Sequence, residues 1–271
     1  MIDIHTHVFP DAVARRCIPM MQADNHMPAY SDGTLDGLRR NMDEAGVDYA
    51  VTMPIVTRVG QCASINAFSA RHHGQDGILC FGGVHPDQPD VFDVLRHIVE
   101  LGLPGIKLHP DYQSFYIDDP RAVRVIRRAT ELGLLVLLHT GLDAGKPSPV
   151  HAPPERTARA LNQLDGERII LAHGGGWHMW EESLRHLAGR KVYMDMAMVP
   201  GYAENTILLQ LLEKHGVDRL LFGSDSPWEH PKRQAERIHA LGLSPAEEQA
   251  LLDGNARRLL GLPQREGDGA F

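Results

Sequence analysis

Residues 2–7 read IDIHTH, and the chain continues with VFPD over residues 8–11. The alternation of apolar and polar residues predicts a short β-strand. Successive side chains of a strand point to opposite faces, so His5 and His7 are expected on one face, with Ile2 and Ile4 on the other. An open doubly wound sheet usually places a glycine-rich turn after its first strand, but this turn has no glycine. The first strand therefore favours a closed barrel, although a doubly wound sheet stays an alternative.

Seven further β-rich runs follow the first at intervals of about 30 residues, each bounded by Gly, Pro or Asp. They are YAVTMPI from Tyr49, ILCFGGVHP from Ile78, GIKLHP from Gly105, LLVLLHT from Leu134, RIILAHGGG from Arg168, KVYMDMAM from Lys191 and RLLFGSD from Arg219. Segments of helical periodicity separate these runs, and several end in glycine, as a helix C-cap should. Eight such repeats predict an α/β fold, a single (β/α)8 TIM barrel.

The barrel domain is expected to span residues 1–263, followed by a C-terminal tail over 264–271. Residues 11–33 form a long insertion after the first strand, and residues 245–261 predict a closing amphipathic helix. The length of 271 residues is ordinary for one barrel.

Composition excludes several classes of protein. The hydrophobic share of 43% predicts a packed core, and the net charge of −8 with no basic stripe argues against a nucleic-acid partner. No run is long enough to span a membrane, and the charged start does not resemble a signal peptide, so we expect a cytoplasmic protein. The three scattered cysteines indicate neither disulfides nor a zinc-thiolate site.

Polar residues end several of the predicted strands. His139 continues the row of Leu135 and Leu137, His173 that of Ile169 and Leu171, and Asp225 that of Leu221 and Gly223. If each row faces inward, these side chains converge with His5 and His7 at the C-terminal mouth, where barrel enzymes place their chemistry. Imidazoles with a carboxylate suit zinc or a related divalent ion. The alternative is a set of hydrogen-bonded core histidines that bind no metal.

These strand-end residues resemble the motif of the amidohydrolase superfamily, in particular its amidohydrolase-2 branch, which includes aminocarboxymuconate semialdehyde decarboxylase. The similarity runs from IDIHTH to the closing GNARRLLGL. It implies one divalent ion, most simply Zn²⁺, held by His5, His7, His139 and Asp225. It also implies that His173 is a catalytic group beside the ion, and that the protein is a homodimer, as barrels of this family often are.

The fourth predicted strand places Lys107 and His109 on one face. In binuclear relatives a lysine at this strand is carboxylated and bridges two metals, so a second ion is an alternative; Lys107 is otherwise an ion-pair partner lower in the barrel. His109 is then a substrate-binding residue. His85 and Trp177 are further substrate-binding candidates, each with a purely structural alternative, and Trp180 and Trp228 are candidate pocket walls. Four other histidines fall in predicted helices and are expected on solvated faces: His97, His186, His215 and His239.

The expected function is hydrolysis of a small-molecule lactone, ester or amide by a metal-activated water, with Asp225 and His173 as catalytic residues. The alternative within the family is metal-dependent, non-oxidative decarboxylation of an aromatic or unsaturated acid, with Arg15, Arg16 or Arg58 as anchors for the carboxylate. A second alternative is a metal-binding barrel without catalytic activity. Substrate identity depends on loops such as residues 11–33 and 141–153, whose shape the sequence pattern does not define.

Overall fold

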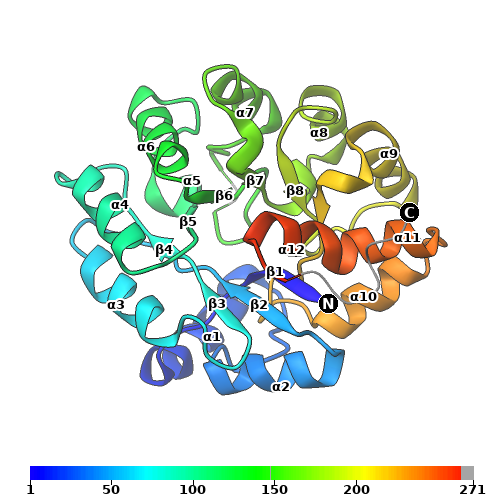
Figure 1. The fold of residues 1–271 in the computed structure, drawn as a ribbon, viewed down its shortest axis with the longest axis horizontal. Helices are drawn as coiled ribbons and strands as arrows, with labels where there is room; N and C mark the ends of the chain where they lie inside the picture. The colour runs from blue at the N-terminus through cyan, green and yellow to red at the C-terminus, as the bar shows by residue number, and fades with distance from the viewer. Residues whose placement is uncertain (147, 264–271) are drawn as a thin grey trace.

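The computed structural model describes residues 1–146 and 148–263, so the predicted tail over 264–271 lies outside the described residues. Parallel strands stand in the middle and helices surround them (Figure 1). The strands are β1 (Ile2–Thr6), β2 (Tyr49–Thr52), β3 (Ile78–Cys80), β4 (Gly82–Gly83), β5 (Gly105–Leu108), β6 (Leu135–Leu138), β7 (Ile169–Leu171), β8 (Tyr193–Asp195) and β9 (Leu220–Leu221). They lie within the eight runs identified in the sequence, and the predicted TIM barrel is confirmed.

The strands pair in two sheets, β1-β2-β3 and β4 through β9, which backbone hydrogen bonds join at both seams. β3 and β4 are two halves of one run, and between them the Phe81 amide donates to the Thr52 carbonyl at 2.9 Å. At the other seam, the Ile4 amide donates to the Phe222 carbonyl at 3.0 Å and the Asp225 amide to the His5 carbonyl at 2.8 Å. The first strand therefore lies beside the last, as closure of a barrel requires.

The outer layer consists of helices that alternate with the strands (Figure 1). They are α1 (Asp11–Asn25), α2 (Leu35–Ala45), α3 (Cys62–His72), α4 (Val91–Glu100), α5 (Pro110–Gln113), α6 (Pro120–Glu131), α7 (Pro154–Leu161), α8 (Trp180–His186), α9 (Asn205–His215), α10 (Pro231–His239), α11 (Pro245–Gln249) and α12 (Asn255–Leu260). The stretch predicted as an insertion after the first strand contains α1. Between α11 and α12 lies one π-helical segment, Ala250–Gly254, so the closing helix extends as predicted.

Two apolar clusters form the core. The larger one packs helix side chains against the outer faces of the strands. The smaller one fills the barrel interior and contains strand residues, such as Leu135, Leu137 and Leu221, together with Ala256 of α12. α12 also contacts β1 and β9, so it covers the N-terminal end of the barrel. The C-terminal end is left for the site.

The structure corrects the expected orientation of β1. Ile2 and Ile4 belong to the interior cluster, whereas the alternation in IDIHTH placed them opposite His5 and His7. The register against β2 shifts between Asp3 and Thr6, which gives β1 one extra residue, as in a β-bulge. The bulge lets Ile2, Ile4 and then His5 of the same strand face the interior, and His7 follows directly after the strand.

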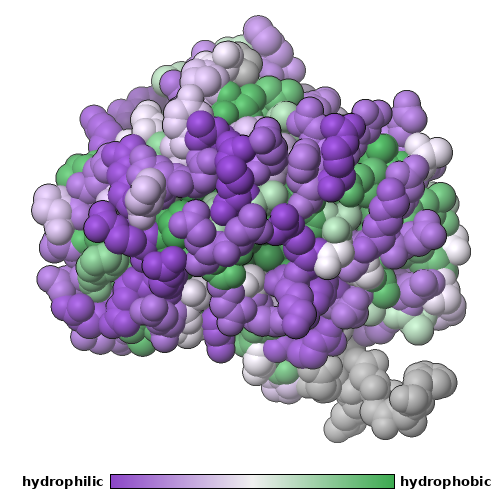
Figure 2. Space-filling model, turned by 90° about the horizontal axis from the view of Figure 1, so that it is seen from above, coloured by the Kyte–Doolittle hydropathy of each residue, from purple (hydrophilic) through white to green (hydrophobic). Residues whose placement is uncertain are grey.

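One histidine assigned to a solvated helical face is buried instead. The His215 Nε2–H donates to the Val192 carbonyl at 3.0 Å, while Nδ1 accepts from the Gly189 amide. His97 and His239 are exposed as expected, and His186 is partly exposed. The surface in Figure 2 is largely hydrophilic, with apolar residues in scattered patches. Within the described residues, no helix is long and apolar enough to cross a membrane.

Candidate metal centre and active site

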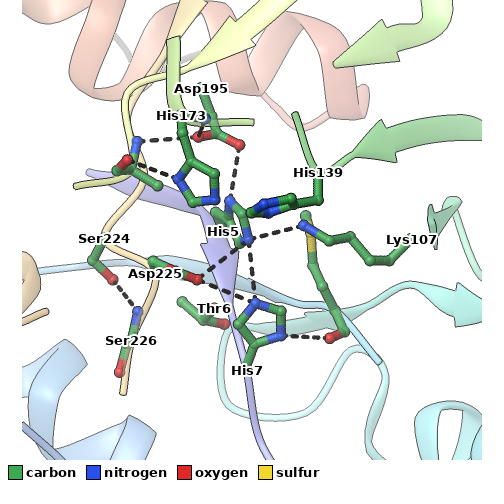
Figure 3. Close-up of polar contacts among 12 residues, drawn as sticks. His5, Thr6, His7, Lys107, His139, His173, Asp195, Ser224, Asp225 and Ser226 are labelled. Atoms are coloured by element: carbon green, nitrogen blue, oxygen red, sulfur yellow. Dashed lines mark hydrogen bonds and ion pairs between the residues drawn. The ribbon is translucent and has the colours of Figure 1, made fainter. Parts of the chain in front are cut away.

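A cavity opens at the C-terminal mouth of the barrel, where five of the predicted site residues line it together: His5, His7, His139, His173 and Asp225. Figure 3 shows the side chains of these residues directed toward one another from β1 and from the ends of β6, β7 and β9. The expected convergence on one mouth is therefore observed, although the metal-binding role of these residues stays a prediction.

Three ligand-type atoms form a nearly regular triangle. The Nε2 atoms of His5 and His7 are 3.2 Å apart, and Asp225 Oδ1 lies 3.4 Å from the first and 3.2 Å from the second. Ligands bound tetrahedrally to zinc at about 2.0–2.1 Å are separated by roughly 3.3 Å, so the triangle has the dimensions of a metal-binding face.

The outer nitrogens of both imidazoles are already engaged as donors. His5 Nδ1 is 2.9 Å from the Asp195 carboxylate and His7 Nδ1 is 2.7 Å from the Met53 carbonyl, and both oxygens are acceptors. In the neutral rings, Nε2 of each therefore carries a lone pair. Two lone pairs and a carboxylate oxygen then converge on one point, an arrangement that a divalent cation stabilises.

The protonation states of the three residues also favour binding of a cation. Burial, and next the Lys107 charge, hold the pKa of His5 well below its ordinary value, so the ring is neutral. Burial raises the pKa of Asp225, but the imidazoles around the carboxylate, including a hydrogen bond from His7, outweigh burial and bring the pKa to about 2. Asp225 itself has a left-handed backbone with φ of 66°, which turns its side chain into the mouth.

His139 stands slightly apart from the triangle. One ring nitrogen of His139, one of His109 and one carboxylate oxygen of Asp143 lie within 4.8 Å of one another. His5, His7 and Asp225 form a separate cluster by the same measure. The His139 Nε2–H donates to the Leu142 carbonyl at 2.9 Å, and the ring stacks on His109 with centroids 4.0 Å apart. In the neutral ring, Nδ1 then carries the lone pair, so it is the nitrogen that can complete a four-ligand set.

His173 reaches the mouth by a route that the strand pattern did not predict. Ile169 and Leu171 belong to the outer cluster, and Ile170 and Ala172 to the interior one, so the assumed inward row was wrong. A left-handed backbone at His173, with φ of 58°, turns the ring inward after the strand. Its centroid lies 5.1 Å from that of His5, and Nδ1–H donates to the Ala197 carbonyl at 3.0 Å.

Lys107 lies within the site rather than lower in the barrel. Its Nζ is 3.1 Å from His5 Nε2, and only 1% of the residue is exposed. Burial lowers the pKa of its ammonium to about 8, with the Asp195 charge opposing the shift. Carboxylation of Lys107 with a second ion stays an alternative to the predicted single ion.

Of the remaining predicted site residues, some line the cavity and others do not. His109 and Trp177 line the cavity, as does Trp228. Trp180 packs behind them, with Nε1–H donating to the His173 carbonyl at 3.0 Å. His85 is not among the described lining residues, and its Nδ1 accepts from the Asp87 amide in a turn, which gives its substrate-binding role no support.

Two ionisable residues among the described lining residues were not predicted from the sequence. Asp143, in the loop after β6, lies with Oδ2 3.3 Å from His109 Nε2, and Tyr112 packs edge-on against His109. Asp195, the last residue of β8, lies behind His5, with Oδ2 2.9 Å from His5 Nδ1. No strand periodicity extends into the loop that carries Asp143, although its spacing of four residues from His139 was a usable hint.

A (β/α)8 barrel with clustered imidazoles and carboxylates at its C-terminal mouth belongs among the barrel enzymes whose site residues can hold a metal. The family model described as Amidohydrolase matches residues 2–262, and the chain belongs to that family. The resemblance inferred from the strand-end residues is thereby confirmed.

Solved structures share the fold at low sequence identity. A 2,6-dihydroxybenzoate decarboxylase in complex with 2,6-dihydroxybenzoate has a TM-score of 0.70 at 17% identity, covering 96% of this chain and 99% of that one. A protein from Pseudomonas putida, described as a proposed 2-pyrone-4,6-dicarboxylic acid hydrolase, has a TM-score of 0.65 at 20% identity, covering 97% and 98%. A dihydroxybenzoic acid decarboxylase from Polaromonas sp. JS666, with bound manganese and 2-nitroresorcinol, has 0.67 at 17% identity, covering 99% of each chain. Among curated proteins, no sequence matches the chain.

Proposed function

We propose that this protein is a metal-dependent hydrolase that cleaves a carbon–oxygen or carbon–nitrogen bond of a small lactone, ester or amide. The observation that carries the proposal is the convergence of His5 Nε2, His7 Nε2 and Asp225 Oδ1 within 3.2–3.4 Å of one another. His139 Nδ1 is the fourth ligand in this proposal. A divalent ion bound there supplies an open coordination position and lowers the pKa of a water molecule toward neutrality.

The protein's own groups then divide the remaining work. Asp225, ionised at neutral pH, is placed to accept a proton from the attacking water through its second carboxylate oxygen and to return it to the leaving group. His173 borders the same cavity and is placed to stabilise negative charge that develops on the substrate oxygen. Trp177 and Trp228 wall the cavity and exclude bulk water from it.

The charges of the cavity favour hydrolysis over decarboxylation. A decarboxylase needs cationic anchors for the carboxylate of its substrate, and Lys107 is the only lysine or arginine among the described lining residues. Arg15, Arg16 and Arg58, the anchors suggested by the sequence, are exposed on the surface and absent from that lining.

Decarboxylation is the second candidate, because Lys107 can pair with one carboxylate and two of the three compared structures are decarboxylases. At 17% sequence identity, this structural similarity supports a shared fold but does not identify the reaction. Manganese in one relative also makes Mn²⁺ an alternative to Zn²⁺.

The test combines metal content with a substrate panel. Protein purified without chelator should hold about one divalent ion per chain, and it should consume at least one of a set of lactones, esters and amides without releasing carbon dioxide. Asp225→Asn should abolish that turnover. Carbon dioxide release from aromatic or muconate-type acids, with solvent deuterium entering the product, would establish the decarboxylase instead. Bound metal with no turnover of either set would favour a barrel without catalytic activity.

A further inference from the structure

A second cavity adjoins the catalytic one on its solvent side. This vestibule is formed by residues 25–28 after α1, 142–144 after β6, 177–178 after β7, and Tyr202 after β8; its volume is about 420 Å³. Asn25, Met27, Asp143, Ala144 and Trp177 line both cavities, so the two share a neck. A substrate whose scissile bond lies at the metal centre would extend through this neck into the vestibule.

One wall of the vestibule is aromatic. The Trp177 ring lies 5.2 Å from that of Tyr202 and 4.5 Å from that of His178, centroid to centroid. Among the described lining residues there is no lysine or arginine. The guanidinium of Arg237 lies 5.8 Å from the Tyr202 centroid, but it is paired with the buried Glu229 carboxylate at 2.9 Å. The walls therefore offer apolar and π contacts and no permanently charged cation, and their polar groups besides Asp143 are Asn25, His26, His178 and the Tyr202 hydroxyl.

Asp143 places a carboxylate at the neck. Its Oδ2 lies 3.3 Å from His109 Nε2, and its Oδ1 accepts from the Gly145 amide at 2.8 Å. His139 Nε2 lies 3.9 Å from the same Oδ2, and among the described residues no lysine or arginine forms an ion pair with this carboxylate. The cations sit deeper: Lys107, and the divalent ion of the proposed function. The cavity is thus polarised, positive at its base and negative at its neck.

We propose that the vestibule binds an uncharged aromatic leaving portion of the substrate, and that Asp143 selects against anionic groups at that end. This inference rests on the proposed function and adds to it the class of substrate: an aryl-bearing ester, lactone or amide whose distal end carries no carboxylate or phosphate. Diacids, which need a cation at both ends, are excluded by the same charge pattern.

Hydroxamates test the inference without requiring turnover, because their head group chelates a divalent metal. The binding of three compounds to the zinc-loaded protein is measured by calorimetry: acetohydroxamate, which reaches only the metal, and phenylacetohydroxamates bearing a 4-carbamoyl or a 4-carboxylate group. The last two are nearly isosteric and differ by one charge. We expect the carbamoyl compound to bind at least about tenfold more tightly than the carboxylate compound, a scale set by one charge repulsion at several ångströms. It should also bind more tightly than acetohydroxamate, which lacks the aryl contact with the vestibule.

Two variants and one control test whether Asp143 and Tyr202 cause these differences in affinity. In Asp143→Asn, the dissociation constants of the carbamoyl and carboxylate compounds should lie within about threefold of each other. Asp87→Asn is the same change at an exposed position outside both cavities, and it should leave the ratio of these dissociation constants unchanged. Tyr202→Leu should weaken the binding of the carbamoyl compound and leave the binding of acetohydroxamate unchanged.

The outcomes separate the two proposals. If acetohydroxamate binds and the carbamoyl compound gains nothing, or the carboxylate binds as tightly, the vestibule inference is wrong while the metal centre stands. If no hydroxamate binds, including acetohydroxamate, both the inference and the metal centre of the proposed function are contradicted.

Discussion

Asp195 determines which nitrogen of His5 faces the mouth of the barrel. Its Oδ2 lies 2.9 Å from His5 Nδ1, while Oδ1 accepts from the backbone amides of His173 and Ala197. One buried carboxylate thus positions a ligand candidate and the strand end that carries His173. A carboxylate behind a metal-binding histidine also increases the basicity of the ring.

Asp195→Asn should therefore weaken metal binding by about 10–100-fold, the usual scale for an outer partner of a histidine ligand. Competition with a chromophoric chelator measures the affinity directly. Asp87→Asn provides the control for a lost surface carboxylate. Unchanged affinity in Asp195→Asn would mean that His5 does not depend on this contact or does not bind the ion.

His173→Asn separates catalysis from metal binding. His173 lies beside the triangle of ligand atoms and not within it, so the variant should keep its metal content and lose about a hundredfold or more in turnover. Loss of the ion from this variant would identify His173 as a ligand.

Many of the ionisable residues that line the mouth could be named from the sequence, because they follow the ends of predicted strands, whereas Asp143 and Tyr112 lie outside these strand ends and were not predicted. The orientations of the strand-end residues could not be predicted. The bulge in β1 and the left-handed backbone of His173 and Asp225 are local departures from strand geometry, and they reverse the parity on which an alternation argument depends. The choice of ring nitrogen likewise depends on contacts such as Met53 with His7.

The burial of His215, outside the site, could not be predicted from the sequence either, because it depends on packing between α9 and the segment before β8. Burial lowers its pKa in the folded state, so the unfolded chain binds the proton more tightly. The stability that depends on neutral His215 is present above the unfolded pKa of about 6.5 and is lost as the pH falls below it. His215→Gln should be less stable at pH 7.5, and its melting temperature should fall less than that of wild type between pH 7 and 5.5. Parallel curves for the two proteins would contradict the assignment.

At the scale of elements, the loop after β6 depends on close backbone contact at Gly141. Gly141 has φ of +89°, and a Cβ built there would lie 2.1 Å from the Trp177 amide nitrogen. Backbone hydrogen bonds join Gly141 to Ala152, and Leu142 to Trp177. The loop that carries Asp143 is thus fixed against the loop that carries Trp177, a contact that helical and strand patterns do not report.

Gly141→Ala should destabilise the protein by about 3 kcal/mol or more, because it adds a backbone clash to the strain of a left-handed alanine. Gly102→Ala is the matched control: its φ is +74°, and nothing lies within 4 Å of its Cβ position. That variant should cost about 1 kcal/mol. Chemical denaturation measures both, and equal losses would show that the close contact at Gly141 relaxes freely.

At the scale of the whole molecule, the proposed ion would join the two ends of the barrel. His5 belongs to β1, His7 follows it directly and Asp225 follows β9, so the ligand triangle spans the seam at which the first and last strands meet. Eight repeated runs predicted the barrel, but they did not predict that its closure and its chemistry share one seam. Binding there stabilises only the closed form, since the unfolded chain does not bring these residues together.

Removal of the ion should therefore lower stability and loosen this seam in particular. With zinc at about a thousand times its dissociation constant, mass action contributes about 4 kcal/mol, which corresponds to a fall of roughly 10 °C in melting temperature after chelation. Amide exchange should accelerate most at Ile4 and Asp225, whose amides donate across the seam, and less at Leu137 in β6. Asp225→Asn, which removes a ligand candidate on one side of the seam, should melt at nearly the same temperature with and without chelator. If chelation left the wild-type melting temperature and the seam amides unchanged, the ion would not join the strands, and the ligand set proposed from β1 and β9 would be wrong.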